Sequence, residues 1–169
     1  MDNNAESWVG KKVEFTKVVS ASIEKVWSCW TDQERMANWW GPDMFTTTIC
    51  EADPVLGGHI YIVFEGPTGK KYPMMGTYVE FDEHKRIVFD SSPIGEDNEV
   101  LITTRQNIEF EDLGDTTALA VTIEVISVTP LCSAISKWNG SWMEPKLGEA
   151  SRICSYSPVK ICFRTINPK

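Results

Sequence analysis

The stretch SASIEKVWSCWTDQERMANWWGP, residues 20–42, decides the fold, because it predicts two short helices directly after one strand. One apolar stripe of a helix is formed by positions i, i+3, i+4 and i+7, which here are Ile23, Val26, Trp27 and Trp30. Ser20 or Ser22 can cap the start of this first helix.

The second helix is expected to follow at once. Thr31 and Glu34 have the spacing of a capping box, so we expect the helix to begin at Thr31. Gly41 and Pro42 are expected to end it.

Strands surround these helices. One strand is predicted before them, at residues 12–19, where Val13 and Phe15 share a face. About six are predicted after them, at 45–52, 59–65, 76–81, 86–90, 99–112 and 116–125. Because no helical segment separates the later strands, a parallel α/β sheet is disfavoured, and an antiparallel sheet with one buried face is expected.

Such a sheet must cover its apolar face. Two short helices cover only part of it, so a long amphipathic helix is expected after Val125. The sequence shows no such pattern there. We expect one α+β domain over residues 1–169, well supported at 12–127 and anomalous from about 128.

Composition narrows the function. The formal net charge of −8 argues against nucleic acid as a partner, because phosphate binding needs clustered Lys and Arg. No apolar run approaches the roughly 20 residues of a membrane helix, and residues 1–12 contain no secretory apolar segment. The five cysteines form no CxxC pair. We therefore expect a reducing, cytoplasmic location without disulfides.

Catalytic and metal-binding signals are weak. His59 and His84 have no convergent ligands at metal-binding spacing, and His84 is expected in a solvated turn. Cys29 and Cys50 lie in apolar or strand segments without a histidine partner. We therefore predict no catalytic residue, no metal and no cofactor.

Large apolar side chains are abundant for a small domain. They can form the core, or they can also line an adaptable apolar pocket. The candidate pocket residues are Trp27, Trp30, Trp39, Trp40, Phe45, Tyr61, Phe64, Met74, Tyr78, Phe89 and Ile102.

The chain resembles a known family across residues 12–127. The matching elements are Val26-Trp27, Thr31-Asp32, WWGP at 39–42, Gly57-Gly58, GPTG at 66–69, Tyr72-Pro73, Gly76 and RIVF at 86–89. They resemble the activator of Hsp90 ATPase homologue 1-like family of the START-like, Bet v 1-like superfamily. The resemblance implies a helix-grip fold, in which a curved antiparallel sheet wraps a long C-terminal helix around an apolar cavity. It implies no metal or nucleotide.

Three functions stay open. The first is binding of a hydrophobic or amphipathic small molecule in the cavity, and the second is a chaperone-associated, Hsp90-type interaction module. The third is a cavity enzyme of cyclase or hydrolase type, which would need a polar group in the pocket. The candidates for that group are His59, Tyr61, Tyr78 and Arg105.

The C-terminal stretch KWNGSWMEPKLGEASRIC, residues 137–154, departs from the family. Relatives run into a helix with a Gly-x-x-x-Gly-Trp pattern there. Because Trp has the single codon TGG, reading one nucleotide later forces Gly at positions 138 and 142, and Met143-Glu144 forces Trp at position 143. We therefore hypothesise that the tail is a frameshifted form of the long helix; the alternative is a genuine divergent tail. Without that helix, the chain could self-associate through the uncovered sheet face.

Overall fold

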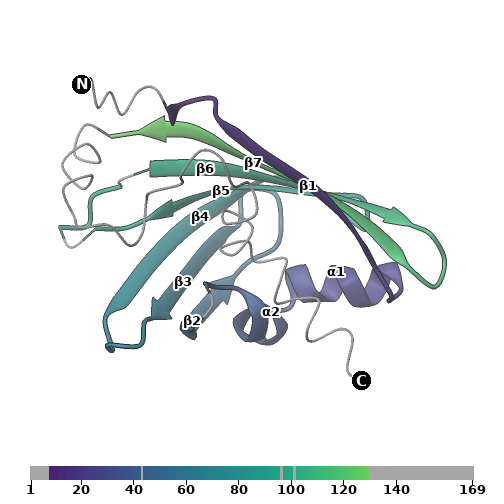
Figure 1. Ribbon diagram of the computed structural model, residues 1–169, viewed down its shortest axis with the longest axis horizontal. Helices are drawn as coiled ribbons and strands as arrows, with labels where there is room; N and C mark the ends of the chain where they lie inside the picture. Colours follow the sequence, from purple (N-terminus) through teal and green to yellow (C-terminus); the bar gives the residue numbers. More distant parts are fainter. Residues whose placement is uncertain (1–7, 43, 96, 101, 130–169) are drawn as a thin grey trace.

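A single antiparallel sheet dominates the computed structural model, which describes residues 8–42, 44–95, 97–100 and 102–129 (Figure 1). Along the chain the elements are β1 (Lys12–Val19), α1 (Ile23–Thr31), α2 (Gln33–Trp39), β2 (Thr46–Ala52), β3 (His59–Glu65), β4 (Lys71–Asp82), β5 (Arg86–Pro93), β6 (Ile102–Asp112) and β7 (Thr117–Val128). In space the seven strands have the order β1-β7-β6-β5-β4-β3-β2. The predicted sequence of one strand, two helices and six strands is confirmed.

The first strand lies beside the last one. Phe15 of β1 pairs with Val121 of β7, so the chain returns to its start after the other strands have formed a meander. This pairing leaves β1 and β2 as the two edges of the sheet.

Strand β4 is longer than its sequence pattern predicts, since it begins at Lys71 and includes Pro73. The carbonyl oxygen of Pro73 accepts a hydrogen bond from the backbone N–H of Ile94, at the end of β5. In an antiparallel sheet, the backbone N and C=O of one residue point toward the same adjacent strand. The position of Pro73 that lacks an N–H therefore faces the end of β5, and no hydrogen bond of the β3 ladder is lost.

The helix caps differ by one residue from the expectation. Asp32, and not Thr31, caps α2, because its carboxylate accepts a hydrogen bond from the Arg35 backbone N–H at 3.0 Å. Thr31 instead closes α1, where its hydroxyl donates to the Trp27 carbonyl at 3.1 Å. Ser22 occupies the N-cap position of α1 but makes no capping hydrogen bond with its side chain. The capping-box prediction was therefore wrong in register, although both helices form.

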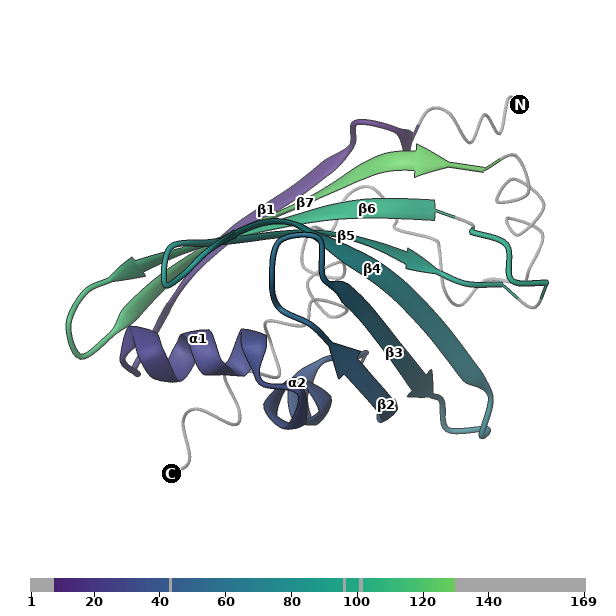
Figure 2. The same cartoon turned by 180° about the vertical axis from the view of Figure 1, so that it is seen from behind.

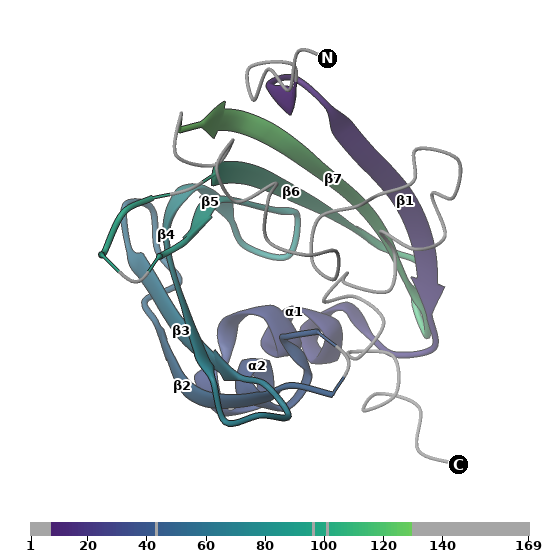
Figure 3. The ribbon, with the colours of Figure 1, turned by 60° about the vertical axis from the view of Figure 1, so that its left-hand side comes forward.

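The sheet curves around the two helices, which lie on its concave side (Figures 2 and 3). All four residues of the predicted apolar stripe, Ile23, Val26, Trp27 and Trp30, are buried. Helix α2 packs on β2, and α1 reaches β6. The expected C-terminal helix and the frameshift hypothesis concern residues that lie outside the described part of the chain.

Candidate ligand-binding face

Two rows of paired residues define the concave face. One row crosses six strands through Ala52, Ile60, Gly76, Ser91, Thr104 and Val125. The next row consists of Tyr78, Phe89, Gln106, Ile123 and Val13. Phe89 contacts Trp40, which follows α2, at 5.2 Å between ring centroids. These rows therefore face the helices, and the alternate positions form the convex face.

Three tryptophans pack against one another where the helices meet this face. The Trp30 and Trp39 rings meet edge to face at 4.7 Å, and Trp39 stacks on Trp40 at 5.4 Å. The Trp39 indole N–H donates to the Cys29 carbonyl at 2.7 Å and so ties α2 to α1. All three rings are buried, so they anchor the helices on the sheet.

Trp27 lies in the middle of α1, about one turn before Trp30. Its ring lies 5.3 Å from Phe81 and 5.0 Å from Phe110, both in edge-to-face geometry. It also lies 5.4 Å from the ring of His84, which is half-buried in the β4–β5 turn. His84 is therefore not the fully solvated residue that its turn sequence predicts.

The other apolar candidates are divided between locations. Phe64, Met74 and Ile102 occupy concave positions and are half-buried. Phe45 packs 5.6 Å from Tyr72, beside the β3–β4 turn. Tyr61 lies on the convex face, because its cross-strand partners are Glu51 and Met75, so it does not line the concave face.

The four polar candidates do not converge. His59 and Arg105 are exposed and occupy convex positions, as Tyr61 does. Only Tyr78 is on the concave face, where it is 1% exposed. Its hydroxyl has no hydrogen-bond partner among the described residues, and burial, with smaller effects of Cys50 and Asp53, raises its pKa above the usual value. These four side chains therefore do not form a pair for acid–base catalysis with one another.

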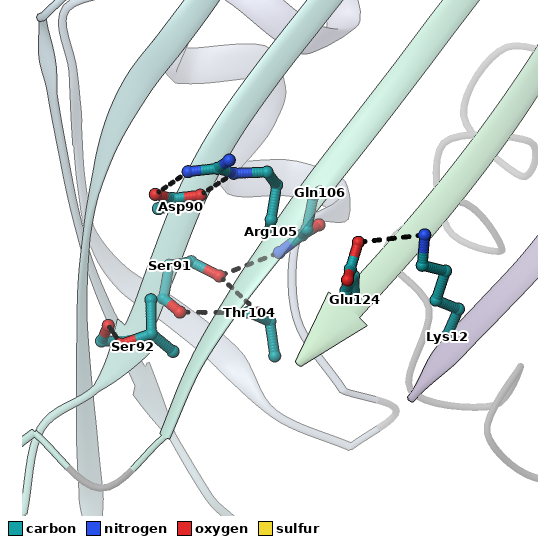
Figure 4. A network of polar contacts seen from close by, with 9 residues as sticks. Lys12, Asp90, Ser91, Ser92, Thr104, Arg105, Gln106 and Glu124 are labelled. Carbon is teal, nitrogen blue, oxygen red and sulfur yellow. Dashed lines mark hydrogen bonds and ion pairs between the residues drawn. The ribbon is translucent and has the colours of Figure 1, made fainter. Parts of the chain in front are cut away.

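A polar row on the concave face had not been identified from the sequence. Gln106 Nε2 donates to Ser91 Oγ at 3.0 Å, and Ser91 Oγ lies 3.1 Å from Thr104 Oγ1 (Figure 4). Gln106 and Ser91 are buried, at 8% and 3% exposure. The available signal was the alternation of β6, in which Thr104 and Gln106 occupy the face shared by Ile102, Ile108 and Phe110.

The convex face carries the charges. Lys12 pairs with Glu124 at 3.2 Å, and Arg105 binds both carboxylate oxygens of Asp90, at 2.7 and 2.8 Å (Figure 4). The hydrogen bonds to Asp90 raise the pKa of Arg105. By contrast, the described concave positions of β3 through β7 carry a single charged side chain, Asp112, which is exposed at the end of β6 opposite Thr117. The two faces of the sheet are thus electrostatically distinct.

A small cleft of about 220 Å³ lies between the end of α2 and the start of β2. Its lining includes Trp40, Gly41, Phe45 and Thr47. The Thr47 hydroxyl donates to the Trp40 carbonyl at 2.6 Å, which fixes the two walls against each other.

Other kinds of site find little support in the described part of the chain. Within residues 8–42, 44–95, 97–100 and 102–129, no three His, Cys, Asp or Glu side chains are grouped closely enough to hold a metal ion. No helix in these ranges is long and apolar enough to cross a membrane.

Solved structures share this fold. A crystal structure from Chromobacterium violaceum has a TM-score of 0.70 at 19% identity and covers 94% of this chain and 98% of its own. A solution structure from Arthrobacter aurescens has a TM-score of 0.71 at 16% identity, with coverages of 98% and 89%. A protein of Mycobacterium smegmatis has a TM-score of 0.67 at 17% identity, with coverages of 94% and 91%. At these identities the likeness concerns the fold alone.

Sequence comparison identifies the family. No curated protein sequence matches the chain significantly. The family model described as "Activator of Hsp90 ATPase homolog 1-like protein" matches residues 20–147. This match begins in the loop before α1 and continues beyond β7, further than the resemblance at 12–127 predicts. The chain therefore belongs to the activator of Hsp90 ATPase homolog 1-like family, with its helix-grip fold.

Proposed function

We propose that the chain binds an apolar or amphipathic small molecule on the concave face of its sheet. The observation that carries this proposal is the extent of that face beyond the two helices. Met74, Ile102 and Ile123 lie on it and are half-buried, whereas the aromatic contacts of α1 and α2 fall on other positions, such as Phe81 and Phe110. Figure 1 shows α1 beneath one end of β1 and β7, and α2 beside β2.

The chemistry of this surface favours such a ligand. Apolar surface gains roughly 25 cal/mol for each Å² removed from water, so a ligand with an apolar body would be stabilised there. Pockets for small molecules are mostly apolar, with a few polar groups that fix orientation. The family assignment supports a ligand-binding or chaperone-related domain and does not name a ligand.

The test is a titration of the full chain with Nile red, an uncharged dye that fluoresces in apolar surroundings. We expect saturable binding of one dye per chain. Ile123→Lys should weaken it at least tenfold, because it places a charge on the concave face. The matched control is Thr122→Lys, the neighbouring position on β7, which pairs with Glu14 on the convex face. Absence of dye binding, or equal effects of the two variants, would contradict the proposal.

A second candidate is a chaperone-associated interaction module, favoured by the description of the matching family. Its test is the ATPase rate of an Hsp90-type chaperone with and without the full chain. A rate that stays constant up to a large excess of the chain would rule this function out.

A further inference from the structure

The polar row on the concave face is a chain of hydrogen bonds with a fixed direction. It begins at Gln106, passes through the hydroxyls of Ser91 and Thr104, and ends at the Ser91 backbone carbonyl, 3.5 Å from Thr104 Oγ1. A carbonyl oxygen can only accept, so the Thr104 hydroxyl must donate to it. Thr104 Oγ1 then accepts from the Ser91 hydroxyl, and Ser91 Oγ accepts from the Gln106 amide. This order fixes the orientation of the Gln106 side chain, with its nitrogen toward Ser91.

The same order leaves the carbonyl oxygen of Gln106 without a donor. No described residue donates a hydrogen bond to Gln106 Oε1, although the residue is only 8% exposed. This oxygen differs from the Tyr78 hydroxyl and Trp30 Nε1, the fully buried side-chain atoms without a partner in the described structure. Gln106 Oε1, in contrast, is not fully enclosed and keeps some accessible surface. A nearly buried acceptor that can still be reached favours a ligand that supplies a hydrogen-bond donor.

Charge restricts the ligand further. Among the described residues, the concave positions of β3 through β7 around Gln106 carry neither a carboxylate nor a cationic group; the one charged group in these rows, Asp112, lies three concave positions further along β6. An anion would face the negative end of the Gln106 carbonyl dipole, and a buried cation would lack a counter-charge. An uncharged donor meets neither obstacle.

The neighbours of Gln106 provide an apolar surface for the rest of the ligand. Its cross-strand partners are Phe89 on β5 and Ile123 on β7. Ile123 is half-buried, and Phe89 is held by Trp40. The ligand body can therefore extend along the apolar face while its donor reaches Gln106.

We infer that Gln106, oriented by Ser91 and Thr104, forms a polar subsite that selects an uncharged, largely apolar ligand bearing a hydroxyl group. An alcohol or phenol would donate its hydrogen to Gln106 Oε1. This inference rests on the proposed function, because it concerns the specificity of the same face.

Three probes that share a ten-carbon chain test this inference: 1-decanol, decyl methyl ether and decanoate. Each is titrated at pH 8 against Nile red bound to the full chain. Decanol and the ether share an oxygen acceptor, but only decanol can donate. We expect decanol to displace the dye about fivefold more tightly than the ether, as one hydrogen bond between neutral groups implies, and decanoate to bind most weakly.

Variants assign the preference to the subsite. Gln106→Leu keeps the approximate size of the side chain and should reduce the preference for decanol over the ether to within twofold. Thr104→Val should reduce it partly, because it frees Ser91 and Gln106 to reorient. Thr103→Val is the matched control, since Thr103 makes the equivalent bond to Ser92, at 2.9 Å, on the convex face. It should leave the preference unchanged.

The outcomes separate the two proposals. Dye binding with equal affinities for decanol and the ether would overturn the subsite while leaving the proposed function in place. A decanol preference that survives in both Gln106→Leu and Thr104→Val would also overturn it. If neither the dye nor any probe binds, the proposed function fails and the subsite fails with it.

Discussion

Replacing Tyr78 with Phe should stabilise the protein, although most substitutions of buried residues do the opposite. The Tyr78 ring is 1% exposed and packs edge-on against Phe81 and Phe89, at centroid distances of 6.0 and 5.9 Å. A Phe ring can keep both contacts. The hydroxyl, in contrast, has no hydrogen-bond partner among the described residues.

The expected magnitude follows from the burial of that hydroxyl. A buried polar group without a partner costs about 1–3 kcal/mol of folding free energy, and its removal leaves no other group unpaired. We expect Tyr78→Phe to increase the free energy of unfolding by about 1 kcal/mol. For a chain of this size, that corresponds to a rise in Tm of about 2–4 °C.

The pH dependence provides a second readout. Burial raises the pKa of Tyr78 above its ordinary value, so the native state keeps this proton to a higher pH than the unfolded state does. Unfolding then releases a proton above about pH 10, and the wild-type protein loses stability as the pH rises further. The Tyr78→Phe variant lacks this contribution, so its advantage over the wild type should grow above pH 10.

Urea denaturation at pH 7.5 and at pH 10.5 measures both effects. Tyr61→Phe is the control, because Tyr61 is half-buried on the convex face; its change should stay within about 0.5 kcal/mol. A loss of 1 kcal/mol or more in Tyr78→Phe would refute the reasoning, since it would mean that the hydroxyl makes a stabilising hydrogen bond.

Three further predictions concern single contacts. Thr117→Val should lower the free energy of unfolding by about 1–2 kcal/mol in urea denaturation, because the fully buried Thr117 hydroxyl donates to the Ala21 carbonyl at 2.8 Å; an unchanged midpoint would contradict this. Gly76→Ala should lower the free energy of unfolding by about 1–3 kcal/mol in thermal melting, since the Cβ of the alanine would collide with the backbone oxygen of Asp90. A variant as stable as the wild type would show that the strands can separate there. Burial raises the pKa of Cys50 to about 11, so iodoacetamide should modify this thiol about a hundredfold more slowly at pH 8 than an ordinary thiol. Peptide-resolved mass spectrometry measures the modification rate, and a rate that does not change between pH 8 and pH 10 would argue against the raised pKa.

Local patterns predicted the order and type of the secondary-structure elements. The apolar stripe from Ile23 to Trp30 predicted α1, because helical period is a property of a few consecutive residues. Alternation likewise predicted the six later strands. It missed the first half of β4, since Pro73 is unfavourable in most strands and its tolerance depends on where β5 ends.

The candidate site was only partly predictable. Sequence alone identified Trp30, Trp39 and Trp40 as large apolar groups near the helices, and they do pack there. It could not assign Tyr61 to the convex face, because a period of two shows which residues share a face but not which face is concave.

The sequence by itself determined the order and type of the elements, because hydrophobic period and turn residues act over short distances along the chain. Only the tertiary structure decided that β1 lies beside β7, that Tyr78 buries an unpartnered hydroxyl, and that Gln106 meets Ser91 from 15 residues away. These features depend on strand register and sheet curvature, which are set by packing between segments that are distant in the sequence.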